Sequence, residues 1–176
     1  MGARRVYALD LQPDACDLTR RNAVRNGVAD RIDCRQGFLF RPLGTVTADL
    51  IVNDVSGVAE TLGRVAGWFP SGVPGGGVDG ADMAVAMFAA VGPHLAPGGR
   101  LLFPVISLSN ERRILDAAHA AFREVHQLAE RNLPLPPSIT EKDSAFFPLL
   151  DAGLIRAEQR RSRWLWQLRI FEATAS

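Results

Sequence analysis

The segment Arg5-Val-Tyr-Ala-Leu-Asp-Leu-Gln-Pro-Asp14 joins an apolar strand, a carboxylate and the start of a helix. Residues 6–9 form an apolar run of the length and β-rich character expected of a strand that is buried on both faces. Pro13 suits the first turn of a helix, where a missing N–H costs little, and Asp14 places negative charge near the positive end of the helix dipole. Asp10 therefore lies at the C-terminal tip of a predicted strand, directly before a helix.

The position of Asp10 makes it a candidate ligand-binding residue. Ligands of open α/β sheets bind outside the carboxyl ends of the strands, where a carboxylate can accept hydrogen bonds from a ribose diol. The alternative for this strand alone is a solvated or capping aspartate. Asn53 and Asp54 repeat the arrangement at the end of a second apolar strand, residues 48–53. Asp54 is a candidate general base for a hydroxyl or amine acceptor, or else a loop aspartate satisfied by the backbone.

Strands and helices alternate along the chain as far as residue 123. The apolar pattern predicts strands at 5–10, 31–36, 48–53, 101–106, 125–131 and 163–172, and helices at 13–26, 81–95, 110–123 and 145–152. Such alternation is typical of an α/β protein with a mostly parallel sheet and helices on both faces. The last two strands, which only a short helix separates, predict an antiparallel C-terminal edge.

The composition excludes several classes of protein. At 176 residues the chain is expected to form one domain, residues 1–176, and its net charge of +1 gives no global attraction to nucleic acid or acidic membranes. It has neither a signal peptide nor an apolar run long enough to span a membrane, so we expect a cytoplasmic protein. The arginines between residues 156 and 163 predict a solvated turn, with a surface for an anionic partner as the alternative.

Neither the cysteines nor the histidines form a metal-binding pattern. Cys16 and Cys34 lack zinc-ligand spacing and predict buried free thiols. The histidines are scattered along the chain, at positions 94, 119 and 126, so we predict no metal site. Ser56 lacks the flanking glycine of a nucleophile elbow, which argues against a hydrolase.

Two further patterns resemble functional motifs. Residues 75–80 match G-x-G-x-x-G, but the prolines before them exclude the buried strand that a dinucleotide site requires. We predict instead that residues 69–80 form a mobile loop over an acceptor pocket. Trp164 and Trp166 share one strand face and predict core packing rather than a base-stacking platform.

Five segments occur in a characteristic order: Val-Tyr-Ala-Leu before Asp10, Arg-Asn-Ala-Val-Arg-Asn-Gly at 21–27, Gln-Gly at 36–37, Asp-Leu-Ile-Val-Asn at 49–53 and Leu-Ala-Pro-Gly-Gly-Arg-Leu-Leu-Phe at 95–103. Together they resemble class I S-adenosylmethionine (SAM)-dependent methyltransferases of the small-domain type, which include ribosomal-protein and release-factor glutamine methyltransferases. The resemblance covers residues 3 to about 108. It implies a Rossmann-like fold, SAM as cofactor, and an in-line displacement at the sulfonium methyl group in which the protein mainly positions the reactants.

The resemblance also implies an adenosine site made by four residues. Asp10 would hold the two ribose hydroxyls and Leu11 would lie beside the adenine, while Gly37 and Phe38 would line the adenine pocket. The family usually has an acidic residue where Phe38 stands, and that residue can bind the adenine amino group. Phe38 can stack or pack, but it cannot accept this hydrogen bond.

Asn53 and Asp54 are the catalytic residues that the resemblance implies, facing the methionine end of SAM and the methyl acceptor, with Asn53 also contacting the cofactor. The family's Asn-Pro-Pro-aromatic motif, which holds a planar amide or an exocyclic amine, is replaced by Asn-Asp-Val-Ser at 53–56. Only Asn53 is retained, which argues against a glutamine or base-nitrogen acceptor. A small molecule or a protein is therefore the expected acceptor, and nucleic acid is not.

The family's Gly-rich loop has no counterpart in this chain, because the first strand and its helix are absent. In this fold the missing strand lies between the strands at 5–10 and 49–54, so its loss leaves two rows of backbone donors and acceptors unpaired. Three explanations stay open. The chain is a truncated version of a longer gene product, or another segment or a second copy completes the sheet, or the two strands pair directly and the cofactor site is damaged.

Two functions from different classes follow from these observations. The first is a SAM-dependent methyltransferase, which the retained Asp10 and Asn53 favour. The second is a binding or scaffold protein that derives from such enzymes and no longer binds the cofactor, which the missing loop and Phe38 favour.

Overall fold

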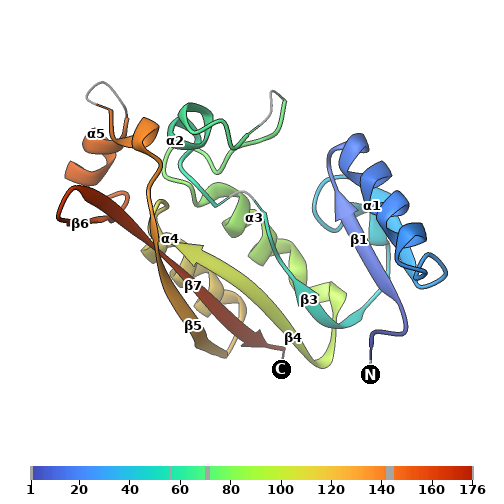
Figure 1. Ribbon diagram of the computed structural model, residues 1–176. Coiled ribbons are helices and arrows are strands. Elements are labelled where there is room, and N and C mark those ends of the chain that lie inside the picture. The colour runs from blue at the N-terminus through green and yellow to red at the C-terminus, as the bar shows by residue number, and fades with distance from the viewer. Residues whose placement is uncertain (1, 56, 70–71, 142–144, 176) are drawn as a thin grey trace. The chain divides into compact units, whose positions relative to one another are not determined.

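The computed structural model describes residues 2–55, 57–69, 72–141 and 145–175 (Figure 1). The chain divides into two compact units, Met1–Val46 and Thr47–Ser176, here called the N-terminal and the C-terminal unit. Both combine strands with helices, and the predicted α/β class is confirmed. Among the described residues, each unit has its own sheet: β1 and β2 form one, and the remaining strands form the other.

The N-terminal unit is a parallel strand pair with one helix. Its elements are β1 (Val6–Asp10), α1 (Pro13–Arg25), β2 (Ile32–Gln36) and the 3-10 turn η1 (Arg41–Leu43). Pairing runs in register from Val6 opposite Ile32 to Asp10 opposite Gln36, so the carboxyl ends of both strands finish at the same edge. α1 packs on this pair with Cys16 buried, and Gly27 ends the helix in a left-handed conformation as expected.

The C-terminal unit contains a mixed, five-stranded sheet. Its strands are β3 (Ala48–Val52), β4 (Leu95–Ile106), β5 (Glu124–Pro134), β6 (Glu158–Arg160) and β7 (Arg163–Thr174). The order is β3-β4-β7-β5, with β6 also paired to β7. β3 and β4 are parallel and every other pair is antiparallel, which confirms the predicted antiparallel C-terminal strands.

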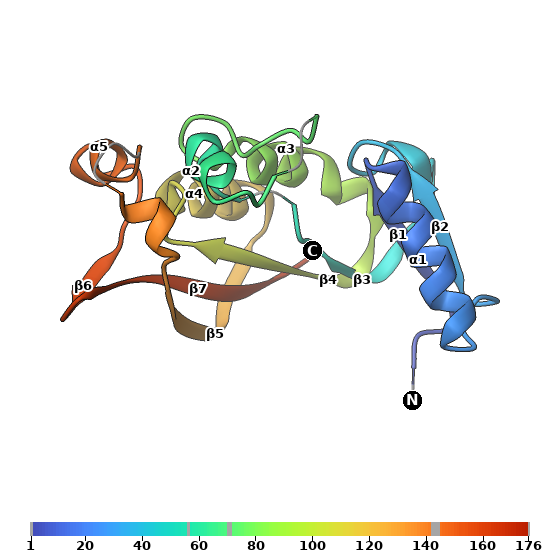
Figure 2. The same ribbon diagram turned by 45° about the horizontal axis from the view of Figure 1, so that its top comes forward.

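The long helices of this unit lie on one face of its sheet (Figure 2). The helical elements are α2 (Glu60–Val65), α3 (Asp82–Val91), η2 (Gly92–His94), α4 (Glu111–Ala121), η3 (Pro137–Thr140) and α5 (Phe146–Asp151). Phe103 of β4 meets Phe88 of α3 edge to face, with ring centroids 4.9 Å apart, and stacks on Phe171 of β7. Figures 1 and 2 show the opposite face of the sheet without a helix from the described part of this unit.

A second apolar core lies where α2, η3 and α5 come together. Leu62, Ile139 and Phe146 are fully buried there. Trp164 packs edge to face on Phe146 at 5.2 Å between centroids, and Trp166 lies against the same cluster. The predicted core role of both tryptophans is therefore confirmed.

One local prediction was wrong and one strand was missed. The helix expected at 81–95 ends at Val91, and β4 already begins at Leu95. Gly99 allows β4 to approach β3 closely, because a Cβ on Gly99 would lie 3.1 Å from the carbonyl oxygen of Ala48. The missed strand is β6, which forms a hairpin with β7 around Arg161, whose φ is +56°. The other arginines between residues 156 and 163 agree with the predicted turn. Nε of Arg160 lies 2.9 Å from Oε1 of Glu158.

Candidate functional site

The ends of β1 and β2 bring together the residues predicted to bind adenosine. The N–H of Gly37 donates to the carbonyl oxygen of Asp10 at 2.9 Å. The side-chain amide of Gln36 donates to the carbonyl of Leu11 at 3.2 Å. Asp10, Leu11 and Gly37 therefore form one continuous edge of the N-terminal unit, and Phe38 follows directly.

The carboxylate of Asp10 is exposed and held in a fixed direction. Its Oδ1 atom accepts the backbone N–H of Gln12 at 2.8 Å, closing the turn that leads into α1. Its Oδ2 atom has no hydrogen-bond partner within the part of the chain that the structure describes. A carboxylate with one oxygen fixed and the other free can still accept a hydroxyl hydrogen bond.

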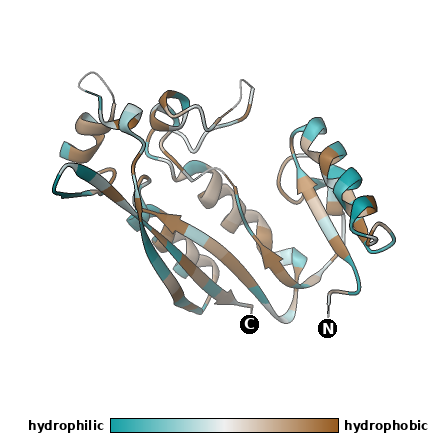
Figure 3. Cartoon of the chain, in the orientation of Figure 1, coloured by the Kyte–Doolittle hydropathy of each residue, from teal (hydrophilic) through white to brown (hydrophobic). Residues whose placement is uncertain are grey.

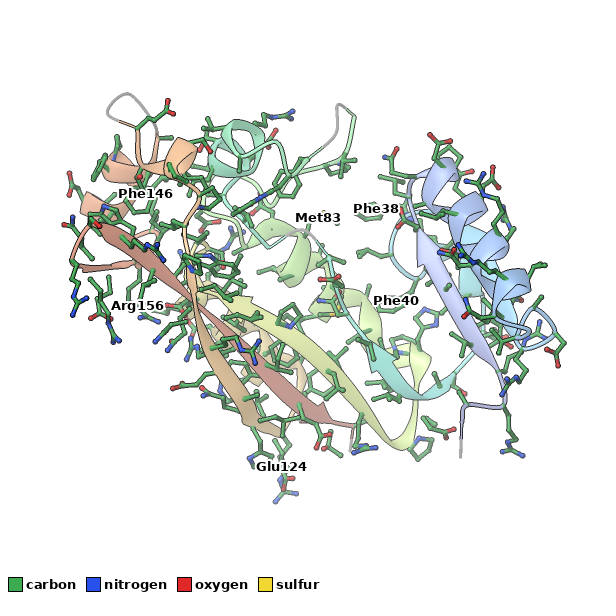
Figure 4. The ribbon with its side chains drawn as sticks, viewed as in Figure 1. Phe38, Phe40, Met83, Glu124, Phe146 and Arg156 are labelled. Atoms are coloured by element: carbon green, nitrogen blue, oxygen red, sulfur yellow. The ribbon has the colours of Figure 1, made fainter. Side chains whose placement is uncertain are left out.

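Gly37 and Phe38 have crowded surroundings. A Cβ on Gly37 would lie 2.3 Å from Cγ of Pro42, so only glycine fits at the tip of β2. The guanidinium of Arg41 lies 5.5 Å from the centroid of the half-buried Phe38 ring. Figure 4 shows Phe38 near the tip of β1. One face of the ring is thus occupied by a cation, and the other is the face that a base could contact.

Asn53 and Asp54 lie in the C-terminal unit, where β3 ends. The N–H of Asn53 donates to the carbonyl of Leu102 at 2.8 Å, and its buried side-chain Oδ1 accepts the N–H of Val55 at 3.3 Å. This leaves the Asn53 amide nitrogen as a donor. Asp54 is exposed and has no hydrogen bond to any described residue. The neighbouring Ser56 lies outside the described residues.

The described part of the glycine-rich loop, residues 72–80, forms several hydrogen bonds with its neighbours. The carbonyls of Gly76, Gly77 and Asp79 accept backbone N–H groups from residues 82, 60 and 110, at 2.9, 2.9 and 2.7 Å. The Asp79 carboxylate also accepts Nδ2 of Asn110 at 3.0 Å and Nη1 of Arg113 at 2.9 Å. No strand leads into α3 from residues 72–80, which supports the rejection of a dinucleotide site.

Asp79 and Arg113 were not found by sequence analysis. The pKa of the Arg113 guanidinium lies above its ordinary value. The largest cause is its hydrogen bond to Asp82, with 2.6 Å between Nη1 of Arg113 and Oδ1 of Asp82. Glu111 likewise accepts from Arg169 at 2.7 Å and from Arg156 at 3.1 Å. These partners are distant in sequence and lack a fixed spacing, so no local pattern could have identified them.

The rest of the described chain was searched for a metal-binding cluster, a membrane-spanning helix and a cavity. Within residues 2–55, 57–69, 72–141 and 145–175, no three His, Cys, Asp or Glu side chains could together hold a metal ion. The helices of the described chain are too short or too polar to cross a membrane. A hollow of about 280 Å³ lies between the start of β4 and Phe122, and it contains none of the predicted site residues.

Two curated relatives of the chain are named as methyltransferases. It is 32% identical over 117 residues to the ribosomal protein uL3 glutamine methyltransferase of Bordetella pertussis, a match that covers 64% of this chain and 38% of the relative. It is also 32% identical over 102 residues to the release factor glutamine methyltransferase of Geobacter sulfurreducens, covering 55% of this chain and 35% of that relative. The predicted resemblance to SAM-dependent methyltransferases is confirmed. No family model matches the chain.

The fold also agrees with solved methyltransferases. Geranyl diphosphate methyltransferase in complex with SAM, the predicted cofactor, superposes with a TM-score of 0.55 at 14% identity, covering 98% of this chain and 69% of the other. This likeness shows the fold. The chain spans less than two fifths of the length of the two curated methyltransferases.

Proposed function

We propose that the chain supplies the adenosine-binding and acceptor-facing strand ends of a SAM-dependent methyltransferase. The observation that carries this proposal is the backbone hydrogen bond from Gly37 to Asp10, which joins the tip of β2 to a residue whose Oδ2 atom has no partner among the described residues. In this role Asp10 accepts the ribose hydroxyls, and Leu11, Gly37 and Phe38 contact the adenine. The methyltransferase relatives support the cofactor assignment.

For Asn53 and Asp54, at the end of β3, we propose a role toward the methionine part of SAM and the methyl acceptor. When bound, SAM would supply an activated methyl group, whose carbon the acceptor's nucleophile would attack in line as S-adenosylhomocysteine leaves. The amide nitrogen of Asn53, which has no hydrogen-bond partner among the described residues, would donate to an acceptor or cofactor oxygen. The exposed carboxylate of Asp54 takes the proton that a hydroxyl or amine acceptor loses. We propose a protein or a small molecule as the acceptor, because the relatives are named for protein substrates and the glutamine-binding motif is not retained.

Calorimetric titration with S-adenosylhomocysteine, the demethylated product, tests the proposal. Asp10→Ala removes hydrogen bonds to a charged acceptor and should weaken binding by about 1–3 kcal/mol. Asp14→Ala is the matched control, since Asp14 is an exposed aspartate in the first turn of α1. Absence of binding by the unmodified chain, or equal binding by the Asp10→Ala variant, would contradict the assignment and favour a scaffold function.

A further inference from the structure

Two cysteines lie side by side inside the N-terminal unit. Cys16 belongs to α1 and Cys34 to β2, and both are free thiols. Cys16 is 1% exposed, whereas Cys34 is partly buried. The side chain of Cys34 forms a hydrogen bond with that of Cys16, so the two thiol groups are in contact. Figure 3 shows their surroundings: β1 is mostly hydrophobic, and α1 mixes hydrophilic with hydrophobic residues.

One face of α1 holds Cys34 in this position. Cys16, Thr19 and Arg20 share that face, because residues three and four positions apart are neighbours on a helix. Thr19 forms a side-chain hydrogen bond with the Cys34 thiol. Nη2 of Arg20 donates to the carbonyl oxygen of Cys34 at 3.0 Å. The thiol pair is therefore part of the packing of α1 on β2.

The thiol pair is also connected to Asp10. The thiol of Cys16 donates to the carbonyl oxygen of Asp10, with 3.7 Å between sulfur and oxygen. The same carbonyl accepts the backbone N–H of Gly37 at 2.9 Å. A thiol is a weak donor, and a disulfide sulfur has no hydrogen to donate. A change in the chemical state of Cys16 therefore acts on a residue of the proposed cofactor site.

The surroundings of Cys34 keep it protonated at neutral pH. Burial and the neighbouring Cys16 thiol raise the pKa of Cys34, while the Arg20 guanidinium and the Thr19 hydroxyl act in the opposite direction. The thiolate is the form that attacks a disulfide, so reaction is slow at neutral pH and faster under mildly alkaline conditions.

We propose that Cys16 and Cys34 form a redox modification site, at which a small-molecule disulfide such as oxidised glutathione converts the two thiols into one internal disulfide. The thiolate of Cys34, the less buried of the two, attacks one sulfur of the reagent and releases one glutathione. The thiolate of Cys16 then attacks the Cys34 sulfur of the mixed disulfide and releases the second glutathione. The two cysteines lose two protons and two electrons, and the reagent gains them as two glutathione thiols.

The disulfide changes the edge that carries Asp10. The sulfur of Cys16 turns from the Asp10 carbonyl to the sulfur of Cys34, so this carbonyl loses one of its two donors. Binding of S-adenosylhomocysteine should weaken by about a factor of three or more, the effect of one weak hydrogen bond. This consequence rests on the proposed function, whereas formation of the disulfide does not.

The experiment treats the full chain with oxidised glutathione at mildly alkaline pH. We expect peptide mass spectrometry to find Cys16 linked to Cys34 in the monomeric chain, and dithiothreitol to remove the link. Cys34→Ser is the matched control, because the chain has two cysteines and this variant keeps one. Its affinity for S-adenosylhomocysteine should not respond to formation of an internal disulfide. Circular dichroism checks that the variant is folded.

A second readout requires no ligand. In two-dimensional NMR spectra of the unmodified chain, the amide signal of Gly37 should shift on oxidation, because its acceptor is the Asp10 carbonyl. The signal of Gly153, in the C-terminal unit, should stay in place. If the reduced chain does not bind S-adenosylhomocysteine, the proposed function fails, while the internal link and the Gly37 signal still report on the thiol pair.

Three results would overturn the proposal. The first is a folded chain that does not react, and the second is one that stops at a mixed disulfide with glutathione on Cys34. The third is a link between two chains in place of the internal link, which non-reducing electrophoresis detects. If the internal link forms but the Gly37 signal stays in place, the modification does not reach the Asp10 edge, and its effect on ligand binding is refuted.

Discussion

The backbone N–H of Gly37 donates a 2.9 Å hydrogen bond to the carbonyl of Asp10, which joins the ends of β1 and β2. Both residues follow apolar strands, and both strands run in the same direction. The contact brings the Asp10 carboxylate beside the loop that begins at Gly37. This edge of the N-terminal unit is the basis of the proposed cofactor site.

Gly37→Ala should destabilise the protein by about 1–3 kcal/mol, because the new methyl group would overlap Pro42. The free energy of unfolding in urea measures the effect. Gly44→Ala is the control: Gly44 has a φ of +62° but open space around its Cβ position, so it should lose only the cost of a left-handed backbone, about 1–2 kcal/mol. S-adenosylhomocysteine binding should fall in the first variant alone. Unchanged binding by Gly37→Ala would indicate that this edge does not contact the ligand.

Asp79→Ala should destabilise the C-terminal unit, because the carboxylate fastens the glycine-rich loop to Asn110 and Arg113. Loss of these charged hydrogen bonds should cost about 1–3 kcal/mol in thermal or urea unfolding. Asp116→Ala removes only an exposed pair with Arg112 on α4, at 3.7 Å, and should cost about 0.5 kcal/mol or less. Equal effects of the two substitutions would show that Asp79 does not hold the loop.

Stability should depend on pH through Asp33. Its pKa lies below the ordinary value, chiefly because Arg35 donates to it at 2.7 Å, with a further hydrogen bond from Arg5 and an opposing effect of burial. Because the pKa of Asp33 is lowered in the folded state, its ionised carboxylate stabilises the fold. This stabilisation is complete above the unfolded-state pKa of about 3.9 and is lost as the pH falls through the folded-state pKa.

Asp33→Asn should therefore reduce the acid dependence of the urea midpoint, measured from neutral pH down to the acid range. Asp30→Asn is the control, because Asp30 is exposed and has no ion pair with any described residue. If both variants keep the pH dependence of the unmodified chain, the Asp33 pair does not contribute to stability.

The sequence predicted the strand ends that carry the candidate site, because apolar runs followed by Asp10 and Asn53 are local patterns. It could not predict the fastening of the glycine-rich loop by Asp79, which depends on contacts with α4. β6 was missed for a similar reason: its three residues are all polar and exposed, and only pairing with β7 makes them a strand. Patterns within a segment are visible in a sequence, whereas contacts between distant segments are not.

The most direct test of the central claim is a titration of the isotopically labelled chain with S-adenosylhomocysteine, followed by the amide signals in two-dimensional NMR spectra. The account predicts that the signals of Leu11, Gly37 and Phe38 shift together with one dissociation constant, and that those of β5 stay in place. Shifts confined to the hollow beside Phe122, or none at saturating ligand, would contradict the proposed cofactor site.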